Sequence, residues 1–563
     1  MIDHRRLHVP RENHAILAEP PLGGVTDVVA ANLALSGART YDLQGRPLAE
    51  IAQLARRELC QAAYHWTANY GQAAAPPPDP AGPIFLAGHQ PEIVHPGVWL
   101  KNFALDKLAR RHGATAVNLM IDSDALAAAS LAVPTGAAAS PRIERIAFDH
   151  ADAAIPYEER EIQDRELFST FGQRVRAEMG GLVADPLIEQ FWPAVLTRAR
   201  SLDNVGACLS QARHQCEIAW GSQSWEVPQS QVCASESFQW LTAHLLAQLP
   251  RFRTVYNEAI SRYRHLHHLR SASHPAPELA EDDPWLEAPL WVWTADDPRR
   301  RRLFVRQDNR ELVLADRQSW EARLPLSADG NAATAVTKLL ELRDAGVKIR
   351  SRALITTLWA RLALGDLFIH GIGGAKYDEV TDLLMERFFG VEPPGFLVLS
   401  GTLYLPIERR QTNGQRSGGQ AAAARGREQS AGQSLPSQLE GTPMQPQPAG
   451  TGLRAIRQEL RELTYHPERF LDGAQNAPAD ALASKQHWIQ TSQTRENARQ
   501  RCQAIRQANE AMQPCLAERR QELLEREAAI IRRVDAQRVL TWREYGFCLY
   551  PEAALLQFFA SLS

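Results

Sequence analysis

The stretch IFLAGHQPEIVHPGVWLKNFALDKLARRHGATAVNLMI, residues 84–121, decides the fold. It begins with the apolar run IFLA at 84–87, which predicts a short buried strand. It ends with the apolar run TAVNLMI at 115–121, which predicts a second buried strand. A helical pattern separates the two runs, so the stretch has the order strand, turn, helix, strand.

The helical pattern begins at Gly97 and is followed by Gly113, at a position where a C-terminal cap glycine is favoured. The apolar residues of this pattern share one helical face: Leu100, Phe103, Ala104 and Leu108. Two strands connected through such a helix are expected to be parallel and joined by a right-handed crossover.

A second unit of the same kind occurs far downstream. DLFIH at 366–370 predicts a strand, GIGG at 371–374 a tight turn, and FLVL at 396–399 the following strand. Between the last two lies a helical face that ends at Gly390: Tyr377, Val380, Leu384 and Phe388. We expect both units to belong to one α/β core with a Rossmann-like, doubly wound parallel sheet.

The rest of the chain divides by composition. Residues 411–450 contain almost no large apolar residue, so this segment cannot offset its ordering entropy and is expected to be a disordered linker. Helical spacing of apolar residues after it predicts a helical hairpin or coiled coil. The expected parts are a helical N-terminal segment at 1–80, core at 81–150 and 331–408, a mainly helical insertion at 151–330, the linker at 409–450, the helical hairpin at 451–540 and a docking tail at 541–563.

Composition excludes several classes of protein. The 563 residues carry 62 basic and 65 acidic side chains, a formal charge of -3, so no whole-chain field favours nucleic acid or an anionic membrane. No signal peptide and no apolar run of about 20 residues is present, which predicts a cytoplasmic protein without membrane contact. Seven cysteines without a CxxC pair indicate reduced, mostly structural thiols.

Polar residues gather where the three predicted strands end. In an open parallel sheet, ligands bind at the carboxyl ends of the strands, so these residues are expected to form one site. The first predicted strand is followed by Gly88, His89, Gln90 and His95, the second by Asp122, Ser123 and Asp124, and the third, which ends at His370, by Gly371, Gly373 and Gly374.

This pattern favours a phosphate ligand. A helix N-terminus offers unpaired N–H groups and a positive dipole end, and glycines let the backbone approach closely. HPGV at 95–98 is similar to the HxGH signature of class I aminoacyl-tRNA synthetases and nucleotidyltransferases, although Val98 stands where the second histidine belongs. KIRSR at 348–352 is similar to the basic KMSKS loop of the same superfamily. These motifs leave the cofactor open, with ATP or ADP as the candidate.

Structural roles are the alternative for each group. His95 and the GHQ turn could cap the following helix, the two aspartates could cap a helix or close a turn, and GIGG could be only a tight connection. His89, His95, Asp122 and Asp124 could hold zinc or manganese, but no local ligand pair enforces it and no metal is assigned.

Two further groups have similar alternatives. HLHH at 265–268 could ligate a metal through His265 and His268, or be solvated or satisfied in the core. The four arginines at 299–302 indicate a solvated edge or, less simply, anion steering.

The chain resembles the cysteine-adding enzymes of bacillithiol synthesis, which are cysteine ligases. That family has a GQQ-type turn, a DHD-type acidic stretch and a GGP-type turn; the counterparts here are Gly88-His89-Gln90, Asp122-Ser123-Asp124 and Gly373-Gly374-Ala375. The resemblance covers 85–135 and 345–405 and, more loosely, the helical arm. It implies a Rossmann-like core, an inserted region, a coiled coil, and an amide formed between cysteine and a glucosaminyl-malate amine. His89 and Ser123 depart from the family pattern, so the substrate need not be the same.

Three hypotheses follow: a cysteine-ligase-like enzyme that joins an amino acid to a small amine, a degenerate nucleotide-binding scaffold, and a nucleotidyltransferase. The expected partners are a small-molecule substrate and a second copy of the chain through the C-terminal helices. For the enzyme, the expected catalytic residues are His89, His95, Asp122 and Asp124. The expected ligand-binding residues are Gly88, Gln90, Gly97, Arg352, His370, Gly371, Gly373 and Gly374.

Overall fold

The computed structural model describes residues 7–36, 40–71, 82–126, 128–150, 152, 155–407, 449–471 and 478–562. The chain forms two compact units. The larger unit combines Met1–Thr135, Ile143–Pro406 and Trp542–Ser563, and the smaller one Gly136–Arg142 and Ile407–Thr541. Each unit has its own cluster of buried apolar side chains. The linker expected at 409–450 lies outside the described residues except for its last two positions, which begin a helix.

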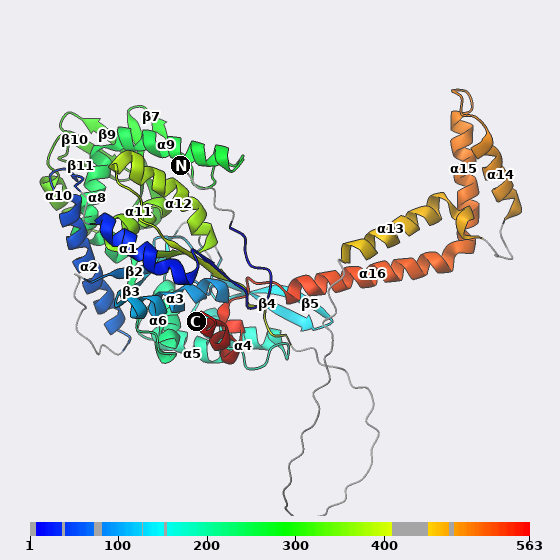
Figure 1. The fold of residues 1–563 in the computed structure, drawn as a ribbon, viewed down its shortest axis with the longest axis horizontal. Helices are drawn as coiled ribbons and strands as arrows, with labels where there is room; N and C mark the ends of the chain where they lie inside the picture. The colour runs from blue at the N-terminus through cyan, green and yellow to red at the C-terminus, as the bar shows by residue number, and fades with distance from the viewer. Residues whose placement is uncertain are drawn as a thin grey trace, which may run out of the picture. The chain divides into compact units, whose positions relative to one another are not determined.

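The larger unit is a mixed α/β structure built on a six-stranded sheet (Figure 1). Four neighbouring pairs of strands are parallel, and only β1 at the edge runs antiparallel to its neighbour. The strands, in spatial order, are β1 (Ile16–Glu19), β14 (Leu397–Gly401), β13 (Leu367–His370), β2 (Ile84–His89), β3 (Thr115–Met120) and β6 (Trp225–Pro228). The four strands predicted from the sequence are therefore confirmed, and they lie side by side.

The two predicted crossover helices are also confirmed. Helix α3 (Pro96–His112) ends at Gly113, whose φ of 61° is left-handed, as a glycine cap requires. Helix α12 (Ile372–Leu384) continues into the π-helical turn η4 (Met385–Phe389) and ends at Gly390 with φ 65°. The prediction of a tight turn at GIGG is wrong beyond its first residue. Gly371 is the N-cap and the next three residues already form the first turn of α12.

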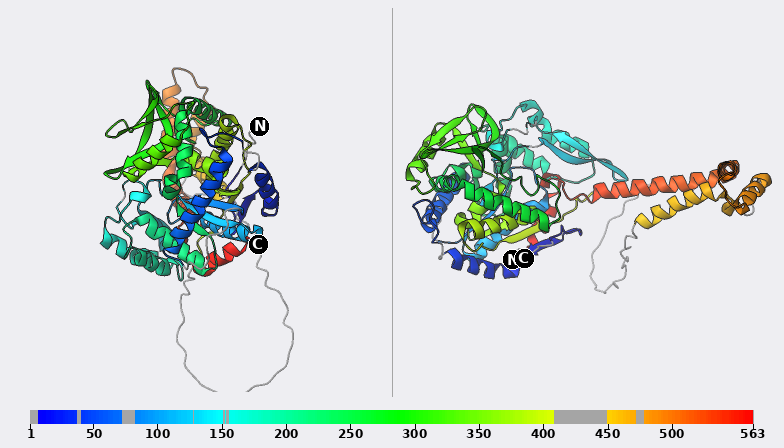
Figure 2. Two further views of the ribbon diagram at one scale, coloured as in Figure 1. Left: turned by 90° about the vertical axis from the view of Figure 1, so that its left-hand side faces the viewer. Right: turned by 90° about the horizontal axis from the view of Figure 1, so that it is seen from above.

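The region from 151 to 330 contains more strand than the sequence analysis expected. Its helices are α4 (Arg165–Met179), α5 (Ile188–Arg198), α6 (Val205–Ala219), α7 (Gln229–Ala234), α8 (Glu236–Ala247) and α9 (Leu249–Leu266). Besides β6 it supplies a second, antiparallel sheet. The strands of that sheet are β7 (Glu281–Asp282), β8 (Trp285–Thr294), β9 (Asp297–Asp308), β10 (Glu311–Ala315) and β11 (Glu321–Leu324), joined by β12 (Val347–Ser351). They appear as the green strands gathered on one side of the larger unit (Figure 2).

Other elements complete the larger unit. They are η1 (Leu22–Gly24), α1 (Val25–Ser36), α2 (Leu48–Ala68), the hairpin of β4 (Ser130–Ala137) and β5 (Ser140–Ala147) apart from its tip at Gly136–Arg142, η2 (Tyr157–Glu159), α10 (Ala333–Asp344), α11 (Ala353–Trp359), the π-helical turn η3 (Ala360–Leu364), η7 (Phe547–Leu549) and α17 (Glu552–Ala560). The N-terminal segment joins the sheet through β1, and α17 packs on α3. Among the described residues, no helix combines the length and the apolar character that crossing a bilayer demands.

The smaller unit is helical. Helices α13 (Ala449–Tyr465) and α16 (Ala517–Leu540) lie side by side, as do α14 (Ala479–Gln490) and α15 (Ala498–Met512) (Figures 1 and 2). Short turns η5 (Pro467–Phe470) and η6 (Gln513–Leu516) join them. Its core is a single apolar cluster in which Leu463, Met512 and Leu523 are fully buried.

Candidate functional site

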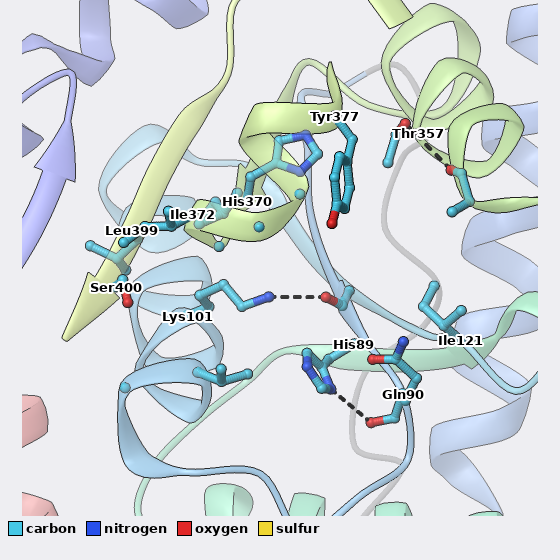
Figure 3. A pocket seen from close by; sticks show the side chains of 18 of the residues that line it. His89, Gln90, Lys101, Ile121, Thr357, His370, Ile372, Tyr377, Leu399 and Ser400 are labelled. Atoms are coloured by element: carbon cyan, nitrogen blue, oxygen red, sulfur yellow. Dashed lines mark hydrogen bonds between the residues drawn. The ribbon is translucent and has the colours of Figure 1, made fainter. Parts of the chain in front are cut away.

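A cavity of about 480 Å³ opens at the carboxyl ends of the parallel strands (Figure 3). Its walls come from the ends of β2, β13 and β14 and from the first turns of α3 and α12. The strand order explains this position. On one side of β2 lie β3 and β6, and on its other side lie β13 and β14. Crossover helices that depart from neighbouring strands in opposite directions leave a crevice between their N-termini.

The cavity gathers most of the predicted residues. All of them line it except Asp122, Arg352 and Ser123, whose buried hydroxyl donates to Gln229 at 3.0 Å. The predicted residues that do are Gly88, His89, Gln90, His95, Gly97, Asp124, His370, Gly371, Gly373 and Gly374.

Asp122 is buried away from the cavity and has a structural role. Its carboxylate accepts hydrogen bonds from the backbone N–H of Ser230, at 2.9 Å, and from the Ser230 hydroxyl, at 2.5 Å. Burial, together with the charge of Glu158, raises the pKa of Asp122 to about 7. The prediction that Asp122 is catalytic is therefore replaced by the capping role that the sequence also allowed.

Arg352 is also held elsewhere. Its Nη1 donates to Glu287 Oε1 at 2.7 Å, and its guanidinium lies 4.3 Å from the ring centroid of Trp291. The KIRSR segment is not a basic loop, because residues up to Ser351 form β12 and pair with β8. Arg350 makes a two-pronged contact with Glu158.

His89 and Lys101 both line the cavity near the end of β2 (Figure 3). His89 ends β2, and its Nδ1 lies 3.2 Å from the carbonyl oxygen of Gln90, so Nδ1 carries the proton. Lys101 is almost fully buried and donates to the carbonyl oxygen of Gly88 at 3.0 Å. Burial lowers the pKa of Lys101 to about 8, and burial plus the Lys101 charge lowers the pKa of His89 to about 3. His89 is thus a neutral hydrogen-bonding group at pH 7.

His95 is the N-cap of α3. Its Nδ1 accepts from the N–H of Gly97 at 3.1 Å, so Nε2 carries the proton of the neutral ring. Nε2 lies 3.4 Å from Glu544 and 3.4 Å from Arg543. Burial and the Arg543 charge lower the pKa of His95 to about 3. His95 therefore caps α3, as one of the two predictions had it, and also lines the cavity, as the other required.

Asp124 is fixed at the mouth of the cavity by two donors. Gln90 Nε2 donates to Asp124 Oδ2 at 2.8 Å, and Arg300 Nη1 donates to Oδ1 at 2.9 Å. Arg300 comes from β9 and stacks on Trp291, 4.5 Å from its ring centroid. One of the four consecutive arginines therefore contributes to the site, while Arg301 pairs with Asp297 and Asp316.

The N-terminus of α12 forms one wall of the cavity. Gly371 to Gly374 line it, and within the described residues no side chain caps these N–H groups. Unpaired N–H groups at the start of a helix suit a phosphate or carboxylate. The neighbouring buried Lys101 forms no ion pair with a carboxylate of the described residues, which also suits an anionic ligand.

His370 ends β13 and is backed by a buried carboxylate. Its Nε2 lies 2.7 Å from Asp378 Oδ2, and Arg361 Nη1 lies 2.9 Å from the same oxygen. Burial alone would raise the pKa of Asp378, but the charges of His370 and Arg361 outweigh it and hold this pKa well below its usual range. Of the cavity histidines, His370 is the one with a buried carboxylate partner.

Several cavity residues were missed from the sequence. They are Lys101, Thr356, Thr357, Tyr377, Ser400, Arg543 and Glu544. Lys101 left a detectable signal, because it falls among the buried positions of α3, where a charged residue needs a reason. Arg543 left none, since only the fold brings the C-terminal segment to the cavity.

The histidine cluster at 265–268 does not form the proposed ligand pair. Helix α9 ends at Leu266 and His268 has a φ of 52°, so His265 and His268 no longer share a helical face. His267 instead contacts Glu379 at 2.6 Å. In the part of the chain that the structure describes, no group of three or more His, Cys, Asp or Glu side chains is placed to hold a metal ion.

Neither a scan against protein-family models nor a search of the curated proteins finds a match to this sequence.

Proposed function

We propose that the larger unit is a ligase that forms an amide bond between an amino acid, cysteine being the first candidate, and a small amine-bearing metabolite. The observation that carries this proposal is the convergence of three distant segments on one cavity. Three segments carry the resemblance to cysteine-adding enzymes, and each supplies residues to the cavity wall: all of Gly88-His89-Gln90, Asp124 of Asp122-Ser123-Asp124, and the two glycines of Gly373-Gly374-Ala375. A site of this volume has the size of ordinary small-molecule sites.

The proposal includes a Rossmann-like core. It is supported by the parallel order β14, β13, β2, β3, β6, in which the chain runs outward from β2 in both directions. The cavity lies at that switch point, where open α/β sheets bind their ligands.

ATP or ADP suits the anion-binding wall of this cavity. The uncapped start of α12, the buried Lys101 and the Nε2–H of His95 would hold the phosphates. His89, whose Nδ1–H already donates to the Gln90 carbonyl, would accept a hydrogen bond from the substrate at Nε2. When bound, ATP would supply the activation of the carboxyl group. The protein's own residues bind and orient the reactants and keep water away from them.

Asp124 would hold the substrate amine. It pairs with Arg300, it lines the cavity, and its two oxygens accept hydrogen bonds from Gln90 and Arg300. A positioned carboxylate can fix an ammonium group through a charge-assisted hydrogen bond. The amine must still lose a proton before it attacks.

The test uses the full chain with cysteine, glucosaminyl-malate and ATP, with and without Mg²⁺, and mass spectrometry to detect the amide. A product heavier than glucosaminyl-malate by one cysteinyl group, absent with the His89→Gln variant, supports the proposal. A comparison of low-molecular-weight thiols in cells with and without the gene extends the test to other amines. No change in any thiol, aminoacyl or amino-sugar metabolite would count against it.

The absence of a second histidine at Val98 favours a binding protein as the second candidate. Calorimetric titration with ATP, ADP and cysteine separates the candidates. Nucleotide binding without amide formation would support the scaffold, and triphosphate cleavage that requires a divalent metal without amide formation would support a nucleotidyltransferase. If none of these ligands binds, both the ligase and the nucleotidyltransferase are excluded.

A further inference from the structure

The reaction proposed above needs a group that takes a proton from the substrate amine, and the first candidates are unsuited to that task. Burial lowers the pKa values of His89 and His95 to about 3, so both rings accept protons poorly at pH 7. Lys101 is already a donor to the carbonyl of Gly88. The cavity therefore needs a different proton acceptor.

His370 has the geometry of such an acceptor. Its ring is held between Phe368 and Phe396, with centroid distances of 4.4 Å and 4.8 Å, and is almost fully buried. Nε2 has no described partner that meets hydrogen-bond geometry, but it lies 2.7 Å from the Asp378 carboxylate, which favours the proton of the neutral ring on Nε2 and leaves the lone pair of Nδ1 available.

The cavity side of the ring is kept open by a glycine. A β-carbon on Gly374 would lie only 2.9 Å from Nδ1, so the absence of a side chain there leaves this nitrogen accessible. Both His370 and Gly374 line the cavity, and no described residue forms a hydrogen bond with Nδ1. Figure 3 shows the His370 ring beside Tyr377 at the cavity wall.

Asp378 is itself held by an ion pair with Arg361. Arg361 contacts Asp378 at 2.9 Å and Asp382 at 2.7 Å, and its guanidinium lies 4.6 Å from the ring centroid of Phe396. Arg361 and Asp378 are almost fully buried, whereas Asp382 is one-third exposed. A carboxylate held in this way orients a histidine ring and stabilises its protonated form.

We propose that His370 accepts the proton of the attacking substrate amine at Nδ1, and that Asp378, anchored by Arg361, is the positioning residue for its ring. This inference rests on the proposed amide-forming function. An N–H bond of the substrate ammonium breaks, its electron pair stays on nitrogen, and the proton moves to Nδ1. The amine then forms the C–N bond to a carboxyl carbon activated as an acyl phosphate or acyl adenylate. The C–O bond to that leaving group breaks with its electron pair, and the second proton lost by the nitrogen goes to water.

The charged and titratable groups around His370 come from several elements. Asp378, Asp382 and Tyr377 belong to α12, and Arg361 belongs to η3. The other charged or titratable residues that line the cavity are His89 of β2, Lys101 of α3, its N-cap His95, and Asp124, Arg543 and Glu544. Only Asp378 among the described carboxylates contacts the His370 ring, which makes it the residue to change.

Nuclear magnetic resonance tests the arrangement without any substrate. The full chain carries ¹⁵N-labelled histidine, and His370→Gln identifies the His370 signals. We expect the Nε2–H tautomer in the wild type, its loss in Asp378→Asn, and its retention in Asp382→Asn, which changes a carboxylate on the same arginine. An Nδ1–H tautomer in the wild type, or identical spectra for the two aspartate variants, would overturn the proposal.

Kinetics tests the role in the reaction. With cysteine, glucosaminyl-malate and ATP, His370→Gln should lower kcat/KM by about 10²- to 10⁴-fold, the usual contribution of a general base. Asp378→Asn should move the acid limb of the pH profile to lower pH, whereas Asp378→Glu should partly restore it and Asp382→Asn should leave it unchanged. A His370→Gln variant that folds and has wild-type kcat/KM overturns the proposal. A wild-type chain that forms no amide overturns the proposed function, while the tautomer measurement still decides how His370 is held.

Discussion

Gly97, in the first turn of α3, lies against Gly401, the last residue of β14. A β-carbon on Gly97 would come within 1.9 Å of the Gly401 carbonyl oxygen and 2.8 Å of its carbonyl carbon. Only a residue without a side chain lets the helix approach the strand this closely. The contact brings His95 beside Arg543, whose Nη2 donates to the same carbonyl oxygen at 3.0 Å.

Gly97→Ala should therefore destabilise the larger unit. The methyl group meets backbone atoms, which cannot move aside as a flexible side chain can, so we expect a loss of about 1–3 kcal/mol or more in the free energy of unfolding. Urea unfolding of the full chain measures it. Gly373→Ala is the matched control, because no described atom lies within 4 Å of the added β-carbon and alanine favours the helix by up to about 1 kcal/mol. Equal effects of the two substitutions would contradict the close approach.

The two neutral histidines should make the protein less stable in acid. Their pKa values are about 3 in the folded chain and about 6.5 when unfolded, so between these values the unfolded chain binds protons that the folded chain does not. The free energy of unfolding then falls as pH decreases through this window. From pH 6.5 to 5 the loss is about 2 kcal/mol for each histidine.

His95→Gln should remove part of this pH dependence. Urea unfolding at pH 5 and pH 7 measures the difference, and the exposed His150→Gln is the control that should behave as the wild type. The same slope in His95→Gln as in the wild type would show that His95 is not held neutral.

Local signals in the sequence were sufficient to predict the core of the fold. The apolar runs of β2, β3, β13 and β14 and the cap glycines Gly113 and Gly390 act over a few residues, and each was found. The antiparallel sheet was underestimated, because β9 carries four consecutive arginines and its alternation is hidden by charge. Three of those arginines, Arg300 to Arg302, form ion pairs with partners such as Asp316 and Glu287, which the sequence does not place nearby.

The candidate site was predicted in outline but not in detail. Strand ends identify an edge of the sheet, so His89, Asp124 and His370 could be found. The sequence could not distinguish the role of Asp122 from that of Asp124. The two residues are separated by one position but lie in different environments, and only the contact with the distant Ser230 shows that Asp122 is the capping residue. Arg300 and Arg543 reach the cavity from distant segments, so no spacing rule identifies them.

Arg300 should matter for ligand binding more than for stability. Its ion pair with Asp124 is partly exposed, and such pairs contribute about 0–1 kcal/mol to folding. Arg300→Ala should therefore leave the urea midpoint nearly unchanged but weaken binding of the amine substrate, since Asp124 loses one of its two fixed donors. Arg301→Ala, which removes contacts to Asp297 and Asp316 in the same strand, is the control. Calorimetric titration of glucosaminyl-malate should show weaker binding for Arg300→Ala alone.

The two aspartates after β3 should respond differently to loss of charge. Asp124→Asn should weaken the productive binding of the amine by about 10- to 150-fold, the worth of a hydrogen bond to a charged group. Asp122→Asn should keep activity, because Asp122 is outside the cavity and its pKa of about 7 leaves it mostly protonated at pH 6. Since this carboxyl holds its proton in the folded chain but releases it near pH 4 when unfolded, wild-type stability falls as pH rises towards 7, and Asp122→Asn should lose that fall. KM for the amine measures the effect of Asp124→Asn on binding, and urea unfolding at pH 6 and pH 8 measures the effect of Asp122→Asn on stability. Loss of activity in Asp122→Asn with normal activity in Asp124→Asn would reverse the assignment.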